Sequence, residues 1–187
     1  DMKQAVAWYR KAEEQGYIKA QCELGLLYAD GEPVTESLNK VASWLRVAAE
    51  QGHTNAQYQL GVMYATGTGV DQSSKQAVEW YRKAAERDHS KAQCELGLMH
   101  LNGYEVTTDT AQAVSWVRVA ANHGHAVAQY QLGMMYATGN ELWTVLGMQR
   151  VIKIKDQSIP KDMKQALEWY RKAAEQGYSK AQCELGL

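Results

Sequence analysis

Few residues of this chain have the types and spacing that a metal or catalytic site needs. His123 and His125 flank Gly124, but no cysteine or carboxylate cluster accompanies them to complete a ligand set. The run from Gly67 to Gly69 resembles part of a phosphate-binding loop, yet no lysine follows it. We therefore expect no metal and no cofactor, and we interpret the two histidines as solvent-exposed residues at the end of a helix.

Motifs for common catalytic chemistry are missing. The sequence contains no P-loop, no His-Glu-x-x-His and no Gly-x-Ser-x-Gly. Glu23, Glu95 and Glu184 are spread along the chain, whereas general acid–base catalysis needs groups that converge on one pocket. The chain is predicted not to be an enzyme. An enzyme with its site in an insertion or in flanking segments is the least favoured alternative.

The three cysteines are predicted to be free thiols. Cys22 and Cys94 occupy the same place in sequence units two repeats apart, which puts them roughly 20 Å from each other if helices pack at 8–10 Å. A disulfide needs Cα atoms within about 7 Å. Cysteine usage therefore leaves the compartment open between cytoplasm, periplasm and secretion.

Composition excludes two classes of partner. The formal net charge of −1 gives no general attraction to nucleic acid or anionic lipid. The apolar runs are too short to cross a bilayer, and residues 1–10 do not resemble a signal peptide. We expect another protein or a peptide as partner, with no nucleic acid and no membrane insertion.

The elements that position these residues come from a 36-residue repeat. Four copies of a Leu-Gly pair follow one another at this interval, and a fifth copy follows 53 residues later. The pairs begin at Leu24, Leu60, Leu96, Leu132 and Leu185. Self-similarity with such a period is typical of stacked helical units that share a continuous core. The functional expectation is a long, shallow binding surface.

Each repeat unit is predicted to form two helices. Residues 38–50 carry apolar side chains at helical spacing and end at Gly52, and a second stripe over residues 54–66 ends at Gly67. Each copy of the first helix carries a tryptophan, and all are predicted to be buried: Trp8, Trp44, Trp80, Trp116 and Trp169. The glycine of each Leu-Gly pair predicts close approach of another helix. Asp88 replaces a helix-ending glycine and is expected in a slightly strained left-handed turn.

These strings resemble the Sel-1-like repeat, a relative of the tetratricopeptide repeat. Ala56 to Gly67, the pair Gly69-Val70 and Ala77 to Glu86 carry the resemblance. It implies an all-α fold, a right-handed α-solenoid of antiparallel helix pairs, used as an adaptor in protein assemblies. The paired cysteines of the cysteine-rich bacterial branch are missing, so disulfide stapling is not expected.

The repeats alternate between two types. Odd units read Trp-Tyr-Arg-Lys and Gln-Cys-Glu-Leu-Gly, and even units read Trp-Leu/Val-Arg-Val and Gln-Tyr-Gln-Leu-Gly. Residues 162–187 also match residues 1–26 at all but four positions, which indicates duplication. Because solenoid ends without polar caps are poorly soluble, end-to-end self-association is an expectation.

An insertion divides the predicted array. We expect repeats over residues 1–139, an insertion over 140–159, and a continuation over 160–187. The insertion is predicted to be a small hairpin or a mobile loop that can interrupt the superhelix. If it docks a partner, its candidate residues are Trp143, Arg150, Lys153 and Lys155.

The predicted partner site is the concave face of the Leu-Gly helices. Helical geometry gives these positions: Lys19, Cys22, Leu26, Asn55, Tyr58, Val62, Lys91, Cys94, Leu98, Leu101, Val127, Tyr130 and Met134. Such a surface suits an extended peptide or a helix. The alternative is that Tyr58 and Tyr130 only pack between neighbouring helices. The arginine of each Trp-x-Arg is expected in a structural pair, with Glu50, Glu86 and Glu175 as candidates.

The sequence thus predicts a non-enzymatic scaffold that holds another protein on its concave face. The principal alternative is a bacterial immunity or regulatory protein that blocks a toxin or lipase, a role that the family resemblance implies for some members.

Overall fold

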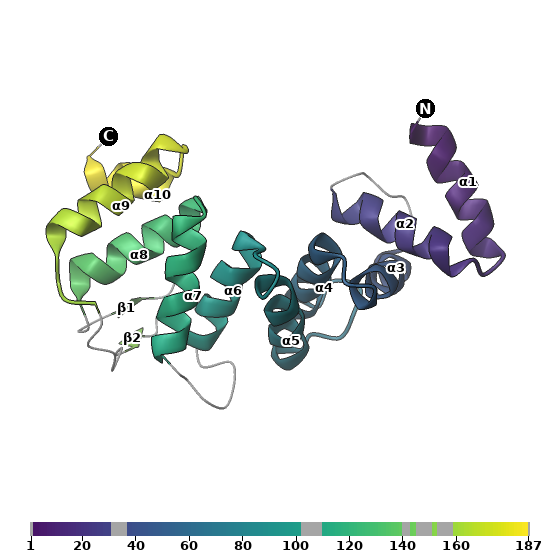
Figure 1. Ribbon diagram of the computed structural model, residues 1–187, viewed down its shortest axis with the longest axis horizontal. Helices are drawn as coiled ribbons and strands as arrows, with labels where there is room; N and C mark the ends of the chain where they lie inside the picture. Colours follow the sequence, from purple (N-terminus) through teal and green to yellow (C-terminus); the bar gives the residue numbers. More distant parts are fainter. Residues whose placement is uncertain are drawn as a thin grey trace. The chain divides into compact units, whose positions relative to one another are not determined.

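The computed structural model describes residues 2–30, 37–101, 110–139, 143–144, 151–152 and 159–186, and it divides into two compact units (Figure 1). Unit 1, Asp1–His89, contains α1 (Met2–Glu14), α2 (Ile18–Ala29), α3 (Leu38–Glu50), α4 (Thr54–Thr66) and α5 (Ser74–Ala85). Unit 2, Ser90–Leu187, contains α6 (Ser90–Leu101), α7 (Thr110–Asn122), α8 (Ala126–Thr138), β1 (Trp143–Thr144), β2 (Val151–Ile152), α9 (Met163–Glu175) and α10 (Ser179–Leu185). The predicted all-α solenoid is confirmed. None of the described helices is long and apolar enough to cross a bilayer.

Helices α2, α4, α6 and α8 each carry a Leu-Gly pair, α10 ends at the leucine of the fifth pair, and each odd-numbered helix carries the repeat tryptophan. Within a unit, a Leu-Gly helix packs on the tryptophan helix that follows it. Leu24, Leu60, Leu96 and Leu132 are fully buried in these contacts. The contact regions therefore form the apolar core, as the repeat pattern predicts.

The glycines explain how the helices come together. A Cβ atom at Gly25 would lie 2.6 Å from the backbone oxygen of Trp44, and one at Gly97 would lie 2.9 Å from the backbone oxygen of Ala113. At Gly61 the atom in the way is instead on the ring of Tyr81, at 2.6 Å. The predicted close approach is confirmed, since any larger side chain would clash.

Two kinds of contact account for the odd and even repeats. On the facing helix, the residue after the tryptophan is aliphatic opposite odd repeats (Leu45 or Val117) and a tyrosine opposite even repeats (Tyr81 or Tyr170). The residue three positions before the glycine changes with this partner. It is cysteine where the facing residue is aliphatic, and tyrosine where the facing residue is tyrosine. The alternation of odd and even repeats therefore reflects two alternating helix interfaces.

The tryptophans differ in burial more than predicted. Trp44 and Trp80 are buried, Trp116 and Trp169 are half-buried, and Trp8 is 69% exposed. The prediction was therefore wrong for Trp8. The equivalent helix α9 packs on both α8 and α10, whereas α1 packs mainly on α2 and reaches α3 through the Glu13–Lys40 ion pair, so Trp8 stays exposed.

The turns follow the predicted conformations. Gly16, Gly52, Gly124 and Gly177 have φ between +81° and +88° after their helices. Asp88 takes the same left-handed conformation with φ +62°, as predicted. This region favours glycine, so Asp88 stores strain in its turn.

The insertion leaves the helix contact around it unchanged. Asp162 N–H donates to the Tyr136 carbonyl at 2.8 Å, just as Ser73 N–H donates to the Tyr64 carbonyl at 2.9 Å in the repeat without an insertion. Ile159 is 2% exposed and packs in the core of unit 2, so it belongs to the array rather than to the insertion. Helix α8 therefore packs on α9 across the insertion as it would across an ordinary linker.

Four residues of the insertion are described, and they pair as the predicted hairpin. Trp143 pairs with Ile152 and Thr144 with Val151 in an antiparallel ladder. The remaining insertion positions 140–142, 145–150 and 153–158 lie outside the described residues, including Arg150, Lys153 and Lys155. The side chain of Trp143 is likewise not described.

Candidate protein-interaction surface

The predicted partner face consists of three rows of equivalent positions on the Leu-Gly helices. The first row lies near the helix starts, where Lys19, Asn55 and Lys91 are exposed and Val127 is half-buried. The third row is half-buried throughout, and its members are Leu26, Val62, Leu98 and Met134. Three of these, Leu26, Leu98 and Met134, pack against the core clusters. The first row is therefore accessible, and the third offers only part of each side chain.

The middle row is the part that the sequence analysis misplaced. Cys22, Cys94 and Tyr130 are 4%, 0% and 6% exposed, so they offer almost no surface to a partner. Tyr58 is half-buried. The reason is the alternating helix interface, which encloses this row between each Leu-Gly helix and the following tryptophan helix. The side chain of Leu101, also predicted here, lies outside the described set.

The two middle-row tyrosines belong to aromatic clusters. The Tyr58 ring lies 5.9 Å from the Tyr81 ring and stacks on His89 at 4.7 Å. In unit 2 the Tyr130 ring lies 5.6 Å from Tyr170 and 5.2 Å from Tyr178. These separations are typical of stabilising aromatic pairs. Tyr130 therefore packs between helices, as the alternative predicts, and Tyr58 packs on its neighbours but keeps part of its side chain accessible.

Burial also sets the chemistry of the thiols. Desolvation, with a smaller contribution from Glu95, raises the pKa of the Cys94 thiol far above its ordinary value, and desolvation followed by Glu23 raises the pKa of Cys22. Both thiols are therefore protonated and unreactive near neutral pH. All three cysteines are free, as predicted, and only Cys183 is exposed.

Polar contacts link successive helices along the face. Asn55 Nδ2 donates to Asp30 Oδ1 at 2.8 Å, which joins α4 to the end of α2. The Arg46 guanidinium donates to the Tyr64 hydroxyl at 2.6 Å. The structural interpretation of Arg46 thus holds, but its hydrogen-bond partner is this hydroxyl rather than Glu50.

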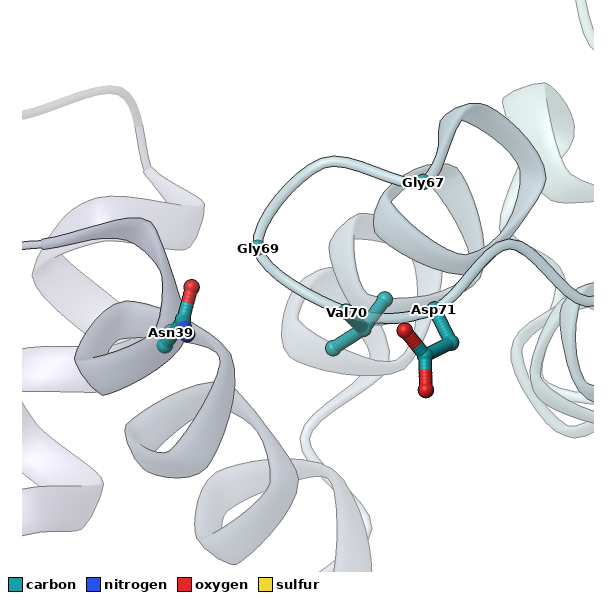
Figure 2. A pocket seen from close by; sticks show the side chains of 5 residues that line it. All are labelled: Asn39, Gly67, Gly69, Val70 and Asp71. Carbon is teal, nitrogen blue, oxygen red and sulfur yellow. The ribbon is translucent and has the colours of Figure 1, made fainter.

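The Gly67–Asp71 linker borders an open hollow of about 400 Å³, which Figure 2 shows between the linker and Asn39 at the start of α3. A Cβ atom at Gly69 would lie 2.5 Å from the Leu38 carbonyl oxygen, and its φ is +72°. This glycine is thus required for packing on α3 and not for cradling a phosphate. Asp71 and Asn39 supply oxygens to its lining.

A second hollow of about 280 Å³ lies where α3, α4 and α5 meet. We call it the Gln57 hollow, and its lining is Ala49, Glu50, Gly52, Gln57, Lys83, Glu86 and Arg87. Its walls carry two cations and two carboxylates. The sequence analysis missed it, although the glutamine recurring before each Cys/Tyr position was a signal that this side chain has a fixed role.

Metal binding has no support among the described residues. These contain no group of three or more histidine, cysteine or carboxylate side chains close enough to hold an ion. His123 is exposed as predicted, and His125 is half-buried.

Comparison with known structures finds two close matches. A protective antigen of uropathogenic Escherichia coli with an SLR fold is 32% identical, with a TM-score of 0.76, and the match covers 97% of this chain and 35% of that one. A Sel1 repeat protein from Oxalobacter formigenes is 38% identical, with a TM-score of 0.73, over 100% of this chain and 69% of that one. The chain thus spans about a third of the E. coli protein. An immunity protein from Pseudomonas aeruginosa is 19% identical with a TM-score of 0.39, which is too distant to carry an argument.

A comparison with curated proteins gives no significant match. The comparison with protein families matches the Sel1 repeat over residues 1–17, 18–53, 54–89, 90–125, 126–143 and 155–178. Three matched segments, 18–53, 54–89 and 90–125, each contain one Leu-Gly helix and the tryptophan helix that follows it. The chain therefore belongs to the Sel1 repeat family.

Proposed function

We propose that this chain is a non-enzymatic scaffold that binds a partner protein or peptide along the Leu-Gly helices. The observation that carries the proposal is the first row, where three equivalent positions, Lys19, Asn55 and Lys91, are exposed. Behind them lie the half-buried aliphatic side chains of the third row. Exposed polar groups beside partly accessible apolar ones are typical of binding surfaces that recognise extended or helical segments.

The middle row contributes to binding indirectly. Its aromatic and thiol side chains fix the spacing between helices, so the first and third rows of one unit are held at set positions. A rigid array of this kind loses little conformational entropy when a partner binds. The buried Tyr130 is accordingly assigned to structure and not to contact.

Photo-crosslinking residues placed at single positions test the proposal. Asn55 and Lys91 are the test positions, and Ser43 and Ser115, exposed on tryptophan helices, are the matched controls. The expected result is a single crosslinked protein of fixed stoichiometry from the test positions and none from the controls. Equal crosslinking from both faces, or none at all from the full chain in its native cells, would contradict a partner surface on the Leu-Gly helices.

A further inference from the structure

A glutamine of the Leu-Gly helix bridges to the helix before it. In Gln57, Gln129 and Gln182 the side-chain Nε2 donates to the backbone oxygen eight residues earlier, at 3.0, 3.2 and 3.3 Å. This bond gives a second donor to a carbonyl near the end of a tryptophan helix, which also accepts from a backbone N–H, as Ala49 does from Gly52 at 3.0 Å. It also fixes the amide, so that its oxygen Oε1 needs a donor from elsewhere.

In unit 2 the next repeat supplies that donor. Gln176, which follows α9, donates from Nε2 to Gln129 Oε1 at 2.8 Å. Gln129 is 5% exposed, and both ends of its amide are thus paired in the interior. The equivalent residue of repeat 2, Gln51, also reaches back, and accepts from the Cys22 thiol at 3.4 Å.

Unit 1 lacks the corresponding donor. Arg87 stands where unit 2 has Gln176, and its Nη1 donates to the Gly52 carbonyl at 2.9 Å instead. Gln57 is 3% exposed, and its Oε1 has no hydrogen-bond partner in the structure. A buried acceptor without a donor is unfavourable, and Gln57 Oε1 lacks the hydrogen bond that Gln129 Oε1 makes; we call this missing bond the vacancy.

The vacancy coincides with the Gln57 hollow. Its volume of about 280 Å³ is several times the share of one water molecule in the liquid, about 30 Å³, and is enough for a polar side chain. Lys83 and Arg87 lie in the wall beside Glu50 and Glu86. The cations disfavour a positively charged ligand, and the carboxylates disfavour a negatively charged one.

We infer that the Gln57 hollow binds a neutral carboxamide, the side chain of a glutamine or asparagine carried by the partner protein. The inference rests on the proposed function, since it names one contact of that partner. The ligand N–H₂ donates to Gln57 Oε1, as Gln176 does in unit 2, and its oxygen accepts from Lys83 or Arg87. Because Oε1 is buried, the ligand reaches it only when the exposed Arg87 side chain turns aside.

Nuclear magnetic resonance titration of the full chain with propionamide tests this inference. The expected result is a saturable shift of the Gln57 side-chain amide and the Gly52 backbone amide. Propionate and propylammonium have the same size but carry charge, and they should bind about tenfold more weakly or not at all. No saturable shift with propionamide, or equal binding of all three probes, overturns the inference.

Two reciprocal variants supply the matched controls. Arg87→Gln restores the internal donor and should abolish the propionamide response at Gln57. Gln176→Arg creates the same vacancy in unit 2 and should produce a new response at Gln129. An Arg87→Gln chain that keeps helical circular dichroism and still responds at Gln57 contradicts the inference.

The partner readout separates this inference from the proposed function. Crosslinking from Asn55 should fall about tenfold in the Arg87→Gln variant. Undiminished crosslinking in that variant overturns the carboxamide contact while the scaffold function stands. A chain without crosslinks at any test position overturns the scaffold function, whereas propionamide binding at Gln57 is measured independently of it.

Discussion

The α4–α5 contact of unit 1 and the α8–α9 contact of unit 2 are built from nearly the same residues but joined by different connections. In both, a glycine faces a tyrosine ring, Gly61 with Tyr81 and Gly133 with Tyr170. A short linker joins the first pair, and the insertion joins the second. The helix interface is nonetheless alike, which shows that side-chain contacts, and not the length of the connection, set the stacking of these repeats.

The two contacts differ in the turns that follow α5 and α9. The last turn of α9 leads into Gln176-Gly177, which pairs with Gln129, and that of α5 leads into Arg87-Asp88, which leaves Gln57 Oε1 unpaired. The contact of unit 1 therefore has one buried hydrogen bond fewer than that of unit 2, and its turn is strained. Where unit 2 has this hydrogen bond, unit 1 has the polar Gln57 hollow.

The largest expected effect is loss of the shared glycine contact. A Cβ atom at Gly61 or Gly133 would lie 2.6 or 2.7 Å from a buried tyrosine ring. Gly61→Val and Gly133→Val should each destabilise their own unit by about 3 kcal/mol, since the core cannot absorb the added volume. Hydrogen exchange of α4 and α8 amides, read separately, measures each loss.

A matched control keeps this test specific. Ser115→Val adds the same side chain at an exposed helical position and should change stability by less than about 0.5 kcal/mol. If Gly133→Val were tolerated while Gly61→Val was not, the two contacts would not be equivalent. The comparison between the units would then fail.

Much of the fold could be predicted from the repeat. The period, the helix limits, the left-handed Asp88 and the close approach at the glycines all follow from local rules that one repeat expresses several times. The burial of Cys22, Cys94 and Tyr130 could not be predicted, because it depends on which helix lies opposite. The alternation of Leu45 with Tyr81 contained that information, but only the packed helices show which residues it concerns.

The second expected effect distinguishes the two glutamines. Gln129→Leu removes two hydrogen bonds, one to the Ala121 carbonyl and one from Gln176, whereas Gln57→Leu removes one bond and also the unpaired Oε1. Gln129→Leu should therefore destabilise unit 2 by about 2 kcal/mol, roughly 1 kcal/mol more than Gln57→Leu destabilises unit 1. Chemical denaturation followed by hydrogen exchange in each unit measures the difference. Equal costs would mean that Gln57 Oε1 is paired in solution.

The same reasoning shows why the candidate site was only partly predictable. Helical geometry places Lys19, Asn55 and Lys91 on one accessible row, and it requires no knowledge of neighbouring helices. The Gln57 hollow depends on a substitution, Arg87 for glutamine, whose effect appears only when the preceding repeat is packed against it. A pattern of single positions cannot show such a missing bond.

The third expected effect concerns the connections. Replacing residues 140–158 with Thr-Gly, the pair that joins Gly67 to Val70, keeps Ile159 in the core and gives unit 2 the linker of unit 1. A shorter loop has less entropy to lose on folding, so unit 2 should become more stable by about 1 kcal/mol. Thermal unfolding of the shortened chain measures this. A less stable unit 2 would show that the insertion supports the α8–α9 contact.

The smallest expected effect compares the two turns directly. Asp88 holds φ +62° with a side chain, and Gly177 holds φ +81° without one. Asp88→Gly should stabilise unit 1 by about 0.5 kcal/mol, because relief of the left-handed strain outweighs the extra freedom of glycine in the unfolded chain, and Gly177→Asp should destabilise unit 2 by about 1 kcal/mol. Midpoints of urea unfolding with unchanged m-values give both figures. If Asp88→Gly were destabilising instead, Asp88 would be making a contact that offsets its backbone strain, and the turn of unit 1 would have to count as part of the polar site beside it.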